Sequence, residues 1–159
     1  MNKICRSETQ LKNIERKIVN LKLKLLNSNF MFNKTNFDLD YLNLLNEYLF
    51  NDFYYDDELG LRKIDDIEKK FLNNYLNKIV YLCVNDPDNI LEILKIIEEI
   101  WHYQPFIVGN TRTLLGFLSI LNDSFNLNLY IDFDREIRRG EESFELGYIV
   151  NQNRLTKHK

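Results

Sequence analysis

The chain is most informative at Gln104-Pro105-Phe106-Ile107-Val108-Gly109-Asn110-Thr111-Arg112-Thr113, a stretch that lies between two apolar helical patterns. Its proline ends the preceding helix, because the ring blocks the turn before it and the residue has no N–H group. Glycine and asparagine in succession are typical of a tight loop. Helical spacing of apolar residues resumes directly afterwards. The stretch therefore predicts a helix, a short loop and a second helix.

Apolar residues recur at intervals of three and four on both sides of this loop, as in helices that pack one face into a core. Asp86 and Pro87 are expected to begin the upstream helix as its cap and first residue. The apolar face of the upstream helix is Ile90, Ile93, Leu94, Ile97 and Trp101. The apolar face of the downstream helix is Leu114, Phe117, Leu118 and Leu121.

Three further helices are predicted nearer the N-terminus. Ser7 and Gln10 form a capping pair at the start of the first. Its apolar stripe is Leu11, Ile14, Ile18, Leu21 and Leu25, and the charged residues placed outside that stripe are Lys12, Glu15, Arg16 and Lys22. The second helix covers about 37–50, with Leu42, Leu45 and Leu49 on one face. The third begins near Ile64, and its predicted stripe is Ile67, Phe71, Tyr75 and Ile79.

The last part of the chain carries weaker signals. Residues 127–133 alternate between apolar and other side chains, which predicts a short extended link without an evident partner strand. Asp134 is expected to cap a last helix that reaches about Val150. We therefore predict an all-α, single-domain helical bundle, divided into an N-terminal helix and turn at 1–34, a main domain at 35–150 and a polar tail at 151–159. The loop of interest lies between two central helices.

Composition excludes several classes of protein. The chain has 159 residues, of which 45% are hydrophobic, so one domain with a core is expected. Its net charge of −3 argues against nucleic acid as a partner. No apolar run approaches the length of a membrane helix. Cys5 and Cys83 have neither metal-ligand spacing nor a disulfide framework, which favours a reduced compartment, the cytoplasm.

The loop also has the properties of an anion site. The first turn of the helix after it offers unpaired N–H groups and the positive end of a dipole. Gly109 allows close approach of the backbone to a ligand. Asn110 adds an amide, Thr111 a hydroxyl, and Arg112 a planar cation suited to phosphate oxygens. The alternative that this reasoning leaves open is an ordinary interhelical turn, with an asparagine cap and a surface arginine.

The same residues resemble the core motif of the Fic family, His-Pro-Phe-x-(Asp/Glu)-Gly-Asn-Gly-Arg-x-x-Arg. The matching positions are Pro105, Phe106, Gly109, Asn110 and Arg112. Upstream, Leu49-Phe50-Asn51-Asp52-Phe53-Tyr54 resembles the Leu-Phe-x-Asp-x-Tyr helix end of that family. The resemblance implies a Fic-like fold and transfer of AMP from ATP to a protein hydroxyl. It also implies that Phe106, Gly109, Asn110, Thr111 and Arg112 bind the phosphates or the nucleotide.

The chain departs from that motif at positions that carry chemistry. Gln104 stands at the position of the family histidine, the general base, and an amide accepts no proton near pH 7. Val108 replaces the acidic ligand of Mg²⁺, so no residue is assigned to a metal. Leu115 replaces the second arginine of the motif. His102, two residues before Gln104, is the candidate for a substitute base.

Three readings follow from these observations. The first is a weakened or inactive Fic-like protein that keeps a nucleotide-binding loop for ATP. The second is an active transferase with altered chemistry, in which His102, a substrate phosphate or water takes the proton. The third is a non-enzymatic interaction module or a toxin–antitoxin component that uses the fold as a scaffold. The expected partners are accordingly a nucleotide, a target protein or an antitoxin-like protein, and a homodimer is compatible with each reading.

Overall fold

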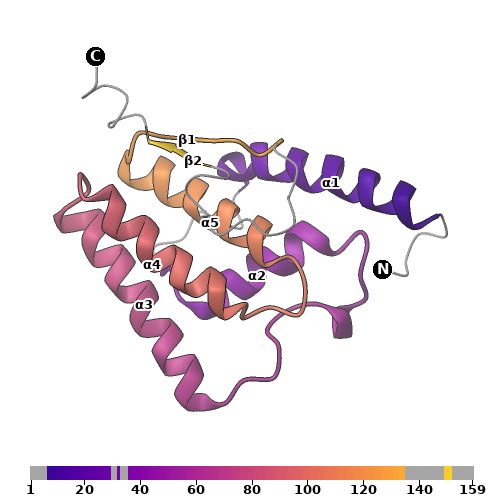
Figure 1. Ribbon diagram of the computed structural model, residues 1–159, viewed down its shortest axis with the longest axis horizontal. Helices are drawn as coiled ribbons and strands as arrows, with labels where there is room; N and C mark the ends of the chain where they lie inside the picture. Colours follow the sequence, from indigo (N-terminus) through magenta and orange to yellow (C-terminus); the bar gives the residue numbers. More distant parts are fainter. Residues whose placement is uncertain (1–6, 30–31, 33–35, 135–148, 152–159) are drawn as a thin grey trace.

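The computed structural model describes residues 7–29, 32, 36–134 and 149–151 as one mostly helical domain (Figure 1). This confirms the predicted all-α, single-domain class. The α-helices are α1 (Glu8–Lys24), α2 (Leu39–Phe50), α3 (Asp66–Asn85), α4 (Ile90–Tyr103) and α5 (Asn110–Phe125). Two single 3₁₀ turns are η1 (Leu26–Ser28) and η3 (Asp56–Glu58), and two short strands are β1 (Leu129–Ile131) and β2 (Ile149–Asn151).

Helix α5 is the centre of the fold (Figure 1). It packs against α1, α2, α3 and α4, and every residue from 112 to 121 is buried. A helix that is apolar around its whole circumference is stable only where neighbours cover it on all sides. Gly116 lets these neighbours approach closely, since a Cβ there would lie 2.9 Å from Leu23 Cδ2. The loop at 104–109 is thus attached to the most buried helix of the protein.

Side-chain caps begin three of the five α-helices. The Ser7 hydroxyl accepts a hydrogen bond from the Gln10 N–H at 3.4 Å, which confirms the predicted cap of α1. Asp38 and Asp65 cap α2 and α3 in the same way. The predicted start of α4 is wrong, because Asp86 ends α3 and α4 begins only at Ile90. Pro87 lies in the turn that joins these two helices.

The apolar stripe predicted for α3 is on the wrong face. Ile67 is 68% exposed and Phe71 is 62% exposed, and of that stripe only Ile79 is buried. The face that packs onto the core is Leu72, Leu76, Ile79 and Cys83. Helix α3 carries apolar residues on both faces, so periodicity alone does not show which face the neighbouring helices cover.

The stripe predicted for α1 is only partly correct. Leu11 is buried, but Leu21 and Leu25 are 57% and 56% exposed. Val19 and Leu23, each 1% exposed, face the core in their place. This rotation of α1 brings side chains that were predicted to face outward, Lys12, Glu15 and Arg16, toward the α4–α5 loop.

The extended segment after α5 has a partner that sequence reasoning missed. Strand β1 pairs antiparallel with β2, with Tyr130 opposite Val150. The Asn122 side chain attaches β1 to α5: its Oδ1 accepts from Leu129 N and its Nδ2 donates to Leu129 O. The predicted last helix therefore does not extend to Val150, and the predicted tail begins inside β2. The rest of that helix, at 135–148, and of that tail, at 152–159, lies outside the described residues.

Among the described residues, no helix is long and apolar enough to cross a membrane.

Candidate phosphate-binding site

The α4–α5 loop has two residues in left-handed backbone conformations. Gln104 ends α4 with φ 54° and ψ 64°, and Gly109 precedes α5 with φ 75° and ψ 27°. Pro105 between them prevents α4 from continuing. Within the described residues, helix α5 begins without a side-chain cap at its N-terminus. The alternative of an asparagine cap at this helix start is therefore not what the structure has, since Gly109 is the N-cap residue.

Asn110 holds the loop in shape. Its Oδ1 accepts a hydrogen bond from Phe106 N at 2.8 Å, and its Nδ2 donates to Phe106 O at 3.0 Å and to Gln104 Oε1 at 3.2 Å. The Asn110 amide is therefore occupied by the loop itself. Phe106 is 2% exposed and packs in the core. Of these two residues predicted to bind phosphate, Asn110 lines the cavity and Phe106 does not, because its ring is buried in the core.

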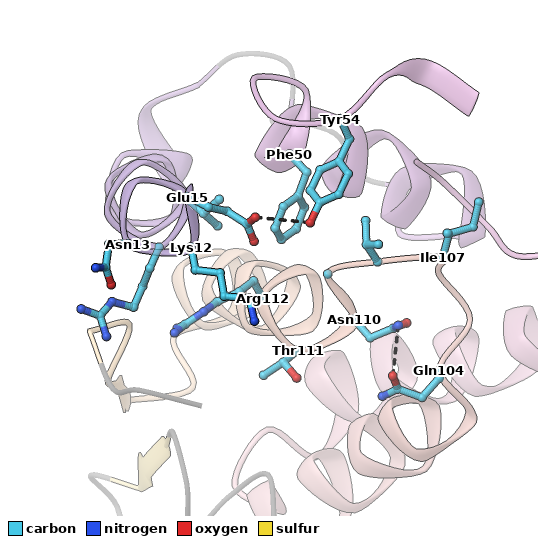
Figure 2. Close-up of a pocket in the computed structure, with 14 residues that line it drawn as sticks. Lys12, Asn13, Glu15, Phe50, Tyr54, Gln104, Ile107, Asn110, Thr111 and Arg112 are labelled. Carbon is cyan, nitrogen blue, oxygen red and sulfur yellow. Dashed lines mark hydrogen bonds between the residues drawn. The ribbon is translucent and has the colours of Figure 1, made fainter. Parts of the chain in front are cut away.

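A chain of hydrogen bonds connects the end of α4 to the start of α5. Gln104 Nε2 donates to Trp101 O at 2.7 Å, and Trp101 Nε1 donates to the Thr111 hydroxyl oxygen at 2.9 Å. The Thr111 hydroxyl accepts in that bond, so its own proton is not used in it. Figure 2 shows Gln104, Asn110 and Thr111 on the same side of the cavity.

Arg112 connects α5 to the segment that follows β1. Its Nη1 donates to Phe133 O at 2.8 Å, and the residue is only 6% exposed. A buried guanidinium requires such partners, because burying an unpaired charge is very costly. Arg112 nevertheless lines the cavity and contributes a permanent positive charge there. Leu115, where the motif has a second arginine, is fully buried in the core and takes no part in the site.

Two residues outside the loop fix its outer edge. Arg62 Nε donates to Gln104 O at 2.7 Å and its Nη2 donates to Tyr103 O at 3.1 Å, so a cation satisfies carbonyl groups at the C-terminus of α4. Asn46, fully buried on α2, donates from Nδ2 to Val108 O at 2.8 Å and accepts at Oδ1 from Gly60 N at 2.9 Å. Sequence reasoning missed Asn46, although a polar residue beside Leu42, Leu45 and Leu49 on the buried face of α2 was a visible signal.

The loop and α1 border an open cavity of about 680 Å³ (Figure 2). Its walls come from α1, from the end of α2 and the turn after it, and from the loop with the start of α5. The lining residues are Lys12, Asn13, Glu15, Arg16, Val19, Phe50, Tyr54, Gln104, Ile107, Val108, Gly109, Asn110, Thr111 and Arg112. The structure thus brings Gly109, Asn110, Thr111 and Arg112 together with cations of α1 that the sequence interpretation had placed on an outer face.

Glu15 is the carboxyl group of this cavity. Its Oε2 accepts a hydrogen bond from the Tyr54 hydroxyl at 3.3 Å (Figure 2). Burial raises the pKa of Glu15 above its ordinary value, and the Tyr54 hydroxyl and Lys12 oppose that rise. Burial and the neighbouring Glu15 raise the pKa of Tyr54 to about 12. The Tyr54 hydroxyl is therefore a donor at neutral pH.

His102 lies apart from this cavity. Its side chain is exposed, with Nε2 at 3.5 Å from Glu98 Oε1 on the same helix. It lines a second, smaller hollow of about 250 Å³ with Lys95 and Glu98, and Gln104 is not part of that hollow. Residues two positions apart on a helix point in different directions. The structure does not bring His102 and Gln104 together.

Metal ligands are not gathered at the site. Within the described part of the chain, no group of three or more histidine, cysteine, aspartate or glutamate side chains could hold a metal ion. Val108 lines the cavity and presents no oxygen from its side chain. Comparisons of the chain with protein-family models, with curated proteins and with solved structures found no match.

Proposed function

We propose that this protein is a Fic-like nucleotide-binding protein, in which the α4–α5 loop binds the phosphates of ATP and transfer of AMP to protein hydroxyls is weakened or lost. One observation carries the proposal: the uncapped start of α5 opens into a cavity of about 680 Å³. Helix N-termini bind anions through their N–H groups and dipole. Ligand cavities in proteins are typically about 300–1,000 Å³.

The walls of the cavity support a ligand with an anionic part and an apolar part. Thr111 and Arg112 give the cavity a hydroxyl and a positive charge, while Phe50 and Tyr54 add aromatic side chains to its lining. A nucleoside phosphate combines these properties. Asn110 and Gly109 support the site indirectly, because they hold the loop in the conformation that leaves the α5 start open.

The reaction itself requires a group that the loop lacks. In AMP transfer, the oxygen of a protein hydroxyl attacks the α-phosphorus of ATP, the bond from that phosphorus to the β-bridging oxygen breaks, and pyrophosphate leaves. The hydroxyl proton must pass to a base. Gln104 is held by Trp101 O and Asn110, and its amide cannot accept that proton. Loss of a general base typically costs about 10²–10⁴ in rate.

The test is transfer of label from ATP carrying a labelled α-phosphate, with Mg²⁺ or Mn²⁺, onto lysate proteins or the chain itself. Native protein is compared with Gln104→His and with Gln104→Asn, which changes the same position without adding a base. ATP binding is measured on the same samples by calorimetry. We expect ATP binding by all three and labelling above background only with Gln104→His.

Each other outcome has a definite reading. Strong labelling by the native chain would show an active transferase with a different proton acceptor. ATP binding without labelling by any variant would indicate a nucleotide-binding protein that no longer transfers AMP. Absence of ATP binding from all three variants would overturn the proposal and favour a role as an interaction scaffold.

A further inference from the structure

The core-facing row of side chains on α1 is apolar near the C-terminus of the helix and cationic near its N-terminus. Leu23 and Val19 are both 1% exposed in the core. Arg16 and Lys12 continue the same row toward the N-terminus, at intervals of three and four residues, and both line the cavity. Positions on one helix face project toward the same neighbour. The row that fills the core at one end of α1 therefore brings two cations over the cavity at the other.

The opposite wall of the cavity is also positive. It carries the first turn of α5, with the positive end of the helix dipole, and the guanidinium of Arg112. Among the described residues that line the cavity, Glu15 alone has a carboxyl group, and its Oε2 is bonded to the Tyr54 hydroxyl. Among the described lining residues, three cationic side chains accompany this one carboxyl group, and an excess of cationic side chains concentrates anions.

We infer that α1 is the second wall of the binding site, with Lys12 and Arg16 binding the outer phosphates of a ligand whose first phosphate contacts the start of α5. This inference rests on the proposed function and extends it. A single phosphate at α5 contacts one wall, whereas a chain of linked phosphates reaches both. The site therefore selects the number of phosphates: a nucleoside triphosphate binds more tightly than the diphosphate, and the diphosphate more tightly than the monophosphate.

The experiment compares affinities for ATP, ADP, AMP and inorganic tripolyphosphate by calorimetry on the full chain, without divalent metal. The double variant Lys12→Gln/Arg16→Gln removes the cations of α1. The matched control is Lys17→Gln, because Lys17 is exposed on the same helix and does not line the cavity. Far-UV circular dichroism and thermal melting check that α1 stays folded in both.

We expect the double variant to lose about tenfold or more in affinity for ATP and tripolyphosphate, since a charge-assisted contact contributes about 1.5–3 kcal/mol and 1.4 kcal/mol is tenfold. Its AMP affinity should change less than about twofold, because AMP does not reach α1. Lys17→Gln should retain the native affinities.

The outcomes separate the two proposals. Equal ATP affinity in a folded double variant and the native chain would overturn the role of α1 while leaving nucleotide binding intact. Binding of tripolyphosphate but not ATP, with dependence on Lys12 and Arg16, would support the role of α1. It would contradict the proposal that the ligand is a nucleotide. If neither ligand binds the native chain, both proposals are wrong.

Discussion

The ring of Phe50 lies against Gly109 so closely that a Cβ on Gly109 would be 2.2 Å from Phe50 Cε2. This contact joins the last residue of α2 to the residue that precedes α5. Gly109 also has φ +75°, a conformation that side chains disfavour. Glycine is thus required at this position by packing and by backbone conformation, before any ligand is considered.

Gly109→Ala is expected to lower the free energy of unfolding by about 2–5 kcal/mol, because the left-handed conformation costs about 1–2 kcal/mol and overpacking costs about 1–3 kcal/mol. Urea denaturation followed by circular dichroism measures the change. Phe50→Val removes the ring atoms that a new methyl would meet. A double-mutant cycle should therefore show a favourable interaction of about 1–3 kcal/mol between the two substitutions. Strict additivity would contradict the packing explanation.

Asn46→Leu is expected to destabilise the protein by about 2–4 kcal/mol, because it leaves the buried Gly60 N and the partly buried Val108 O without this partner. The matched control is Asn77→Leu on the exposed face of α3, with an expected change within about 0.5 kcal/mol. Hydrogen exchange adds a local readout, since the Gly60 amide should exchange faster in Asn46→Leu. A variant as stable as the native chain would show that Asn46 does not hold the loop.

Features set by neighbouring residues could be predicted from the sequence. The proline and glycine of the α4–α5 loop act through local sterics, and the Ser7 cap acts over three residues. The phosphate-binding candidates Gly109, Asn110, Thr111 and Arg112 are neighbours in sequence, so they were found together.

Features set by distant contacts could not be predicted in the same way. Ile67 and Phe71 have the spacing of a core stripe, yet α3 packs through Leu72 and Leu76. The side chains of Lys12 and Arg16 face the cavity because Val19 and Leu23 anchor α1 in the core, and a sequence with two apolar rows does not show which row is anchored. The pairing of β1 with β2 joins segments about twenty residues apart, with no turn motif to indicate it.

Cys83 is expected to resist thiol reagents in the native protein. It is buried on α3, and burial raises its pKa to about 12. At pH 8 only about one thiol in 10⁴ is then the reactive thiolate, compared with about one in four for an ordinary cysteine. In a Cys5→Ser background, labelling by an aromatic disulfide should occur at the rate of unfolding and become fast in concentrated guanidinium. Rapid labelling under native conditions would show that α3 opens locally.

Glu15→Gln is expected to stabilise the protein at neutral pH. Because burial raises the pKa of Glu15 in the folded state, folding favours its protonated form. The ionised Glu15 carboxylate therefore lowers the free energy of unfolding. This loss of stability is absent below the ordinary carboxyl pKa of about 4 and complete above the raised pKa of Glu15 in the folded state. The stability difference between Glu15→Gln and the native chain should appear as pH rises through that window. Denaturant titrations across the acid range measure it.

The matched control for Glu15 is Glu99→Gln, an exposed carboxyl group on α4. The two variants remove the same charge from the chain, so a difference between their pH profiles isolates the effect of the cavity. Glu15→Gln should also bind tripolyphosphate more tightly than the native chain at neutral pH, because it removes a carboxylate that would repel the anion from the cavity lining. At a pH low enough to protonate Glu15, the two affinities should converge. Equal affinities at every pH would show that the anion does not enter the space between α1 and the loop.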